Sequence, residues 1–353
     1  MEWNKKFDIA VKSLGFNQCK SDQCLYVYRK NGKTMYLLLY VDDFLLAGCD
    51  EALLLETKSK IKSLFEMRDL GEVSYFLGIK ISRVNGGLFL SQEVYINKLL
   101  LKFKMDNCAS INTPLEIKPP RGTSGESVLG VKPYKELIGS LMYACMATRP
   151  DICVAVNHFS QFQVNPTTEH WKGLKRILRY LKGTSKWGLW YKSMAYSPIT
   201  LHVDADFANE PGRKSVSGFI VETYGDCVAW ATRKQTSVAL SSTEAEYIAL
   251  ATGVREILWL RQILNELGIS GLDQPIPVFE DNQAVIHALK VWDMKRLKHI
   301  DVKYNFVKDL FMKNVINVTY QPTGDQVADM MTKGLSLELF SKHRKGLGMT
   351  EVV

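Results

Sequence analysis

The chain has 353 residues, of which 46% are apolar and 23% are charged, a composition typical of a globular protein with two or three domains. The longest uncharged apolar run, residues 35–41, is far shorter than the roughly 20 residues that a membrane span needs, and charges near the start argue against a signal peptide. Seven scattered cysteines without a C-x-x-C pair argue against a disulfide framework or a zinc site. We therefore expect an intracellular protein, cytoplasmic or nuclear, that crosses no membrane.

The net charge of +8 is divided unevenly along the chain. Residues 1–194 carry 28 Lys and Arg against 18 Asp and Glu, a net charge of +10, whereas residues 195–335 carry 14 against 17, a net charge of −3. A basic part followed by an acid-rich part predicts a surface that binds a polyanion, joined to a site that uses carboxylates.

The first predicted element is a hairpin over residues 34–48, TMYLLLYVDDFLLAG, in which two β-prone runs meet at Asp42 and Asp43. Further short strands are predicted in residues 71–92, with a turn at Asn-Gly-Gly, and a helix is expected from a cap at Ser91 to Met105. The Pro-, Gly- and Ser-rich segment that follows predicts a linker.

Residues 168–183, TEHWKGLKRILRYLKG, predict a basic amphipathic helix whose opposite side carries Trp171 and three leucines. A charged helix face is often only solvated, so binding to nucleic acid is one of two readings here. The basic side chains recur at spacings of three and four: Lys172, Lys175, Arg176, Arg179 and Lys182.

From residue 199 onward the pattern predicts three strands in succession, a long helix over residues 243–267, and then alternating strands and helices that end with a helix over residues 326–333. Three successive strands permit an antiparallel meander, and the later alternation permits parallel additions. The predicted fold is therefore α/β, with a mixed five-stranded sheet and flanking helices.

Four acidic positions in this half follow or interrupt apolar segments, where an isolated charge would be unfavourable. Clustered carboxylates repel one another unless cations neutralise them, so the pattern predicts two divalent ions, Mg²⁺ or Mn²⁺, that activate water at a phosphodiester. The candidates are Asp204 or Asp206, Glu246, Asp281 and Asp329.

The long helix contains two glutamates that we expect to differ in role. Glu244 has capping-box spacing from Ser241 and can reach back to the amide of Ser241. Glu246 lies about 200° around the helix from Glu244, on the side of Ala249 and Gly253, so the predicted metal ligand is Glu246.

Motifs along nearly the whole chain resemble those of copia-type retrotransposon Pol polyproteins. DADFA, RKSVSGF, RKQTSVALSSTEAEYIALA, EDNQAVI, KHIDVKYNFVKD and ADMMTKGL are similar to the ribonuclease H domain of that family. YVDD, FLGIKI, LSQEVYINKLL, ELIGSLMYACMATRPDI and HWKGLKRILRYLKGT are similar to its reverse transcriptase palm, thumb and connection.

The resemblance implies a partial reverse transcriptase palm and thumb in residues 1–115, a linker at 116–132 and a helical connection at 133–194. A ribonuclease H-like domain is implied for residues 195–335, and a tail for residues 336–353. The implied activity is metal-dependent hydrolysis of the RNA strand of an RNA–DNA hybrid. The ligands implied are Asp204, Glu246, Asp281 and Asp329, with Asp42 and Asp43 as polymerase carboxylates.

Some departures from the family pattern qualify this reading. A polymerase needs a third palm carboxylate, and only Asp8 and Asp22 precede the YVDD, in segments that do not read as strand ends. We therefore expect no polymerase activity from this chain alone, and whether another fragment complements it is left open. No histidine precedes Asp329 in YQPTGDQVAD, and His299 is expected either to bond the helix start near Asp301 or to contact the substrate backbone.

Two alternatives compete with this interpretation. The first is a catalytically inactive, element-derived protein that binds nucleic acid. The second is an integrase-type transferase, which is disfavoured because its glutamate comes last in the chain, whereas Glu246 lies between the first and third aspartates.

Overall fold

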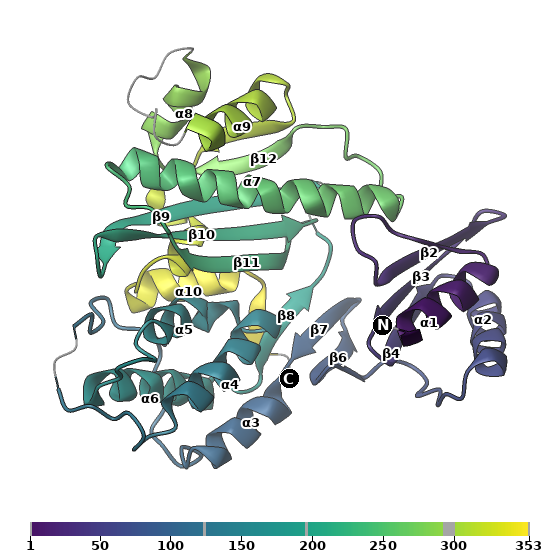
Figure 1. Ribbon diagram of the computed structural model, residues 1–353, viewed down its shortest axis with the longest axis horizontal. Helices are drawn as coiled ribbons and strands as arrows, with labels where there is room; N and C mark the ends of the chain where they lie inside the picture. Colours follow the sequence, from purple (N-terminus) through teal and green to yellow (C-terminus); the bar gives the residue numbers. More distant parts are fainter. Residues whose placement is uncertain (1, 123–124, 195–196, 292–300, 352–353) are drawn as a thin grey trace. The chain divides into compact units, whose positions relative to one another are not determined.

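The structure, a computed structural model, describes residues 2–122, 125–194, 197–291 and 301–351 (Figure 1). It divides into two compact units: Met1–Val73 with Leu258–Leu272, and Ser74–Ile257 with Asp273–Val353. The predicted boundary at residue 115 therefore differs from the division that the structure shows. Among the described residues, no helix is long and apolar enough to cross a membrane.

The first unit contains a four-stranded antiparallel sheet in the order β1-β2-β3-β4, with buried Phe7, Tyr26, Leu37 and Ile61 in its core. The predicted hairpin is confirmed, because β3 pairs with β4 and Tyr40 lies opposite Asp43. The elements are α1 (Glu2–Ser13), β1 (Phe16–Gln18), β2 (Leu25–Lys30), β3 (Lys33–Tyr40), β4 (Asp43–Gly48) and α2 (Glu51–Leu64).

The second unit begins with the short strands expected after residue 71, and these join a sheet in the order β14-β8-β7-β6-β5. Its strands come from three distant parts of the sequence: β5 (Tyr75–Phe76), β6 (Ile79–Val84), β7 (Gly87–Ser91), β8 (Trp187–Tyr191) and β14 (Met349–Glu351). Because β7 pairs with β8, residues 74–115 belong to the second unit and not to the first. Part of the predicted tail also has regular structure, as α10 (Leu337–Gly346) and as β14, which pairs with β8.

Helices of the connecting region pack on this sheet, and one buried cluster joins them to the sheet that follows. Leu141 and Leu178 of the helices share that cluster with Ile220 and Met331, so no separate core divides the predicted connection from the predicted ribonuclease H-like domain. The N-cap position of the first helix is Gln92, whose side chain makes no capping hydrogen bond, rather than the predicted Ser91. The helices are α3 (Glu93–Lys102), α4 (Tyr134–Ala147), η1 (Pro150–Ile152), α5 (Cys153–Ser160) and α6 (Thr168–Gly183).

The predicted mixed sheet is confirmed as five strands in the order β11-β10-β9-β12-β13. β9, β10 and β11 form an antiparallel meander, and β12 and β13 add in parallel to β9. The strands are β9 (Thr200–Glu210), β10 (Lys214–Thr223), β11 (Asp226–Lys234), β12 (Ile276–Glu280) and β13 (Ile316–Tyr320).

Helical elements cover both faces of this sheet (Figure 1). A Cβ added at Gly253 of α7 would lie 2.9 Å from Leu201 and Val203, so the absent side chain permits this close approach. On the other face, a Cβ added at Gly218 would lie 2.6 Å from the side chain of Met331. The glycine therefore allows a 3₁₀ turn to pack closely against the sheet at this point. The predicted last helix is wrong, because residues 327–331 form that short turn instead. The elements are α7 (Ser242–Glu266), α8 (Gln283–Lys290), α9 (Asp301–Met312), η3 (Thr323–Asp325) and η4 (Val327–Met331).

Candidate metal centre

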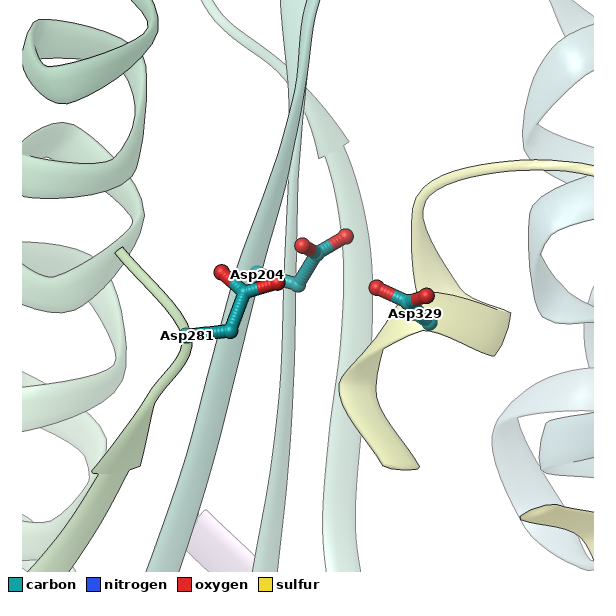
Figure 2. A group of neighbouring side chains, drawn as sticks. All are labelled: Asp204, Asp281 and Asp329. Atoms are coloured by element: carbon teal, nitrogen blue, oxygen red, sulfur yellow. The ribbon is translucent and has the colours of Figure 1, made fainter. Parts of the chain in front are cut away.

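Three aspartates from separate elements converge at the end of β12 in the mixed sheet. Asp204 lies on β9, Asp281 directly follows β12, and Asp329 lies in η4. One carboxylate oxygen from each lies within 4.8 Å of the others, and Figure 2 shows the carboxylate of Asp204 between those of Asp281 and Asp329. Because β9 and β12 are parallel, with Val278 opposite Leu201, Asp281 comes level with Asp204. Gly218, which lies opposite Asp204, gives η4 room to approach.

A second group of carboxylates shares Asp281 with the first. Oxygens of Glu246, Glu280 and Asp281 also lie within 4.8 Å of one another, although Asp281 itself is only half-buried. Glu280 was not expected from the sequence. The signal was the alternation of β12, in which Ile276, Val278 and Glu280 all point to the buried side.

Asp206 lies outside both groups. Its carboxylate is half-buried and accepts a hydrogen bond from the side-chain amide of Asn209. Of the two positions that the sequence left open, the structure therefore brings Asp204, and not Asp206, to the other acidic residues.

Glu244 bonds to the backbone at the start of α7, away from both groups. Its backbone amide donates to Ser241 Oγ at 3.1 Å, and its carboxylate accepts from the amide of Leu240 at 2.8 Å. The predicted donor amide, that of Ser241, was one residue off, but the side chain still bonds the amides at this helix start.

Burial dominates the electrostatics of the cluster. It raises the pKa of Asp204 and Glu246, and it raises that of Asp329 to about 7, with the nearby Asp204 charge adding to the effect. The pKa of Glu280 is likewise raised by burial. Ionised together, these groups need cationic partners.

One such partner belongs to the protein. The ammonium of Lys333 lies 2.9 Å from Asp329 Oδ1 and 3.9 Å from Asp204 Oδ2, and the hydroxyl of Thr332 donates to Asp204. Although burial acts to lower the pKa of Lys333, the charges of Asp204 and Asp329 raise it overall. Asp281 is held by the hydroxyl of Thr323 at 2.7 Å.

The residues present fit divalent cations that prefer oxygen ligands. Glu246 Oε2 and Glu280 Oε2 are buried without a hydrogen-bond partner in the part of the chain that the structure describes. A bound cation would satisfy both oxygens, and Asp281 is a candidate ligand in both groups.

The YVDD pair has a different environment. Asp42 and Asp43 are exposed at the turn between β3 and β4. Neither joins a group of three potential metal ligands within residues 2–122, 125–194, 197–291 and 301–351. Asp8 is bonded by Lys12 and Tyr26, and Asp22 by the amide of Cys24.

The basic face of α6 is partly engaged by the segment that precedes the linker. Arg176 donates to Thr113 at 2.8 Å, and Arg179 donates to the carbonyl of Ala109 at 2.8 Å. Lys172 pairs with Glu169 of its own helix at 2.8 Å.

A pocket of about 400 Å³ remains beside the basic face of α6, lined in part by Lys172, Lys175, Arg176 and Arg179. The exposed Lys182 lies at the end of the helix. His299, which was expected either to bond the helix start near Asp301 or to contact the substrate backbone, lies outside the described residues.

Comparison with known proteins places these features in a family. A family model of reverse transcriptase (RNA-dependent DNA polymerase) matches residues 1–117. The chain is 37% identical over 361 residues to the retrovirus-related Pol polyprotein from transposon TNT 1-94 of Nicotiana tabacum, which covers 99% of this chain and 27% of that protein. It is also 37% identical over 354 residues to the corresponding polyprotein from transposon RE1 of Arabidopsis thaliana, covering 99% of this chain and 24% of that protein.

A shorter relative is matched over most of its own length. The putative transposon Ty5-1 protein of Saccharomyces cerevisiae is 31% identical over 259 residues, which cover 72% of this chain and 84% of that protein. Among solved structures, LC11-RNase H1 in complex with RNA/DNA hybrid is 14% identical with a TM-score of 0.30, over 38% of this chain and 93% of that chain, a likeness too weak to support an argument.

The chain spans about a quarter of the length of the two plant polyproteins. Its first third matches a reverse transcriptase model, and it keeps 37% identity to those polyproteins over 99% of its residues. The chain therefore belongs to the copia-type retrotransposon Pol polyprotein family.

Proposed function

We propose that this chain hydrolyses the RNA strand of an RNA–DNA hybrid in a reaction that depends on divalent metal ions. The observation that carries the proposal is the convergence of Asp204, Asp281 and Asp329 at the end of β12, with Glu246 in a second group that shares Asp281. A cluster of carboxylates destabilises a protein core unless cations are bound, because each ionised group that is removed from water needs a positive partner.

Asp204, Asp281 and Asp329 would hold one ion, and Glu246 with Asp281 would hold the other. Two such ions, when bound, supply an activated water and stabilise the leaving oxygen of the phosphodiester. The protein's contribution is to fix the ligands in advance. Hydrogen bonds from Thr332 and Thr323 orient Asp204 and Asp281, so both carboxylates are already positioned before the substrate binds.

The RNA strand would be selected through its 2′-hydroxyl groups, which DNA lacks. The basic side chains of α6 that remain accessible, above all Lys175 and Lys182, would bind phosphates of the hybrid. This surface and the metal centre belong to the same compact unit.

The decisive test is a cleavage assay with the purified full chain. With Mg²⁺ or Mn²⁺, the chain should cut the RNA of a labelled hybrid, and it should spare duplex DNA of the same sequence. Chelation by EDTA should stop the reaction, and added metal should restore it. Tight hybrid binding without cleavage would instead favour the catalytically inactive, nucleic-acid-binding alternative.

We infer further that this chain does not extend a primer by itself. Asp42 and Asp43 are exposed, and within the described residues no third acid completes a metal-binding group with them. The check is template-directed nucleotide addition by the same preparation that cleaves the hybrid. Extension of the primer would show that another acid takes part in the palm.

A further inference from the structure

Glu280 is a fully buried carboxylate beside the proposed metal ligands. It ends β12, with an exposed fraction of 0%. One oxygen, Oε1, accepts a hydrogen bond from the amide of Asn282 at 3.0 Å. The other oxygen, Oε2, has no hydrogen-bond partner among the residues that the structure describes.

A second buried carboxylate in the same group shares this deficiency. Glu246 is 6% exposed, and its Oε2 also lacks a partner within the described part of the chain. Oxygens of Glu246, Glu280 and Asp281 lie within 4.8 Å of one another. Ionised carboxylates this close together repel one another, and a divalent cation between them would satisfy the unpartnered oxygens without moving the backbone.

The group of Asp204, Asp281 and Asp329 already has a positive partner in the protein. Lys333 already places its ammonium 2.9 Å from Asp329 and 3.9 Å from Asp204. Among the described ion pairs, none involves Glu246 or Glu280. The two carboxylate groups therefore differ: one contains a protein cation, and no carboxylate of the Glu246, Glu280 and Asp281 group pairs with a cation among the residues that the structure describes.

We propose that Glu280 is a ligand of the metal ion held by Glu246 and Asp281, so that three carboxylates bind this ion. The proposal rests on the proposed metal-dependent function and extends the ligand set of that site. With three negative charges against one divalent cation, this position fills at a lower metal concentration than the position beside Lys333, where the ammonium competes for the same oxygens.

Metal binding in the absence of nucleic acid tests the proposal. The full chain is titrated with Mn²⁺, and free Mn²⁺ is followed by its electron paramagnetic resonance signal. Wild type should show one tight and one weaker class of sites. Glu280→Gln should weaken the tight class at least about tenfold, and Glu280→Asp, which keeps the charge on a shorter side chain, should weaken it less.

Glu210→Gln is the matched control. Glu210 is also a buried glutamate of the sheet, but it bonds to His158 and Gln161 and lies outside both carboxylate groups, so its change should leave both classes of sites intact. The melting temperature of each variant is measured with and without Mn²⁺. The increase that Mn²⁺ causes is a second measure of metal binding, and it corrects for any change in stability that the substitution itself causes.

The outcomes separate this proposal from the function on which it rests. Wild type that binds Mn²⁺, with Glu280→Gln binding it equally well, would overturn the role of Glu280 alone. A wild type that binds no Mn²⁺ at millimolar concentration would overturn both the role of Glu280 and the metal-dependent function. Weakened binding in Glu280→Gln together with unchanged binding in Glu210→Gln would support the proposal.

Discussion

The chain carries two sets of aspartates that the sequence marks as candidate metal ligands, and the two sets differ in burial and in convergence. Asp42 and Asp43 are adjacent in sequence and exposed at a hairpin turn. Asp204, Asp281 and Asp329 are far apart in sequence, come from three elements, and meet within 4.8 Å. Exposed carboxylates are hydrated and require no partner, whereas buried carboxylates that are ionised require cations. Convergence and burial, more than a short motif, therefore indicate where an ion is needed.

The largest expected effect comes from removing the one acid that both carboxylate groups share. Asp281→Asn should reduce hybrid cleavage at least about 1,000-fold, roughly 4 kcal/mol of barrier, because both ions lose a ligand. Steady-state cleavage and circular dichroism measure the rate and the fold. Asp42→Asn, the matched change in the exposed pair, should leave cleavage unchanged. If Asp281→Asn unfolds the chain, Asp281 is a structural residue.

The next effect distinguishes the two glutamates of α7. Glu246→Gln should slow cleavage at least about 100-fold, roughly 2.7 kcal/mol, with little change in melting temperature. Glu244→Gln should be mild in both respects, because glutamine can also accept from a backbone amide at the helix start. Both rates come from the same hybrid assay. A reversed order of the two rates would make Glu244 the ligand.

A smaller effect concerns pH in the absence of metal. Folding raises the pKa of Asp329 to about 7, so the folded chain retains this proton between the ordinary aspartate range and pH 7, while the unfolded chain loses it. The stability of wild type relative to Asp329→Asn should therefore fall as pH rises from about 4 to about 7, and then level off. Thermal melting of both proteins in EDTA measures this difference, and a difference independent of pH would contradict the raised pKa.

The smallest effect is expected on the basic face of α6. Replacing Lys175 and Lys182 by Gln should weaken hybrid binding and flatten the plot of log affinity against log salt by about 0.9 for each phosphate that the variant no longer binds. Arg179→Gln should instead lower the melting temperature, because Arg179 bonds the carbonyl of Ala109. Equal salt slopes for wild type and the double lysine variant would leave these lysines as solvated charge.

Sequence reasoning identified the hairpin, the mixed sheet and the converging aspartates because those features depend on local periodicity and on acids that end apolar strands. It missed what depends on long-range pairing. The unit boundary near residue 73 follows from β7 pairing with β8, whose residues lie about 100 positions later, and no local pattern predicts that partner.

The missed metal-centre residue has a different explanation. Glu280 directly precedes Asp281, and adjacent strand residues ordinarily face opposite sides, so a strand pattern does not suggest both acids for one site. The alternation through Ile276 and Val278 placed Glu280 on the buried side. The two arginines of α6 were candidates for binding nucleic acid, because a sequence does not show that Ala109 and Thr113 accept their hydrogen bonds.

The pairing of β14 with β8 has a consequence for how the chain acquires its structure. The sheet that begins with residues 75–91 is completed by Met349–Glu351, and α10 packs against the turn that carries Asp329. Pairings between such distant residues close large loops and form slowly. On the ribosome, therefore, β8 remains an open strand edge, prone to pairing with other chains, until the last of these residues emerges.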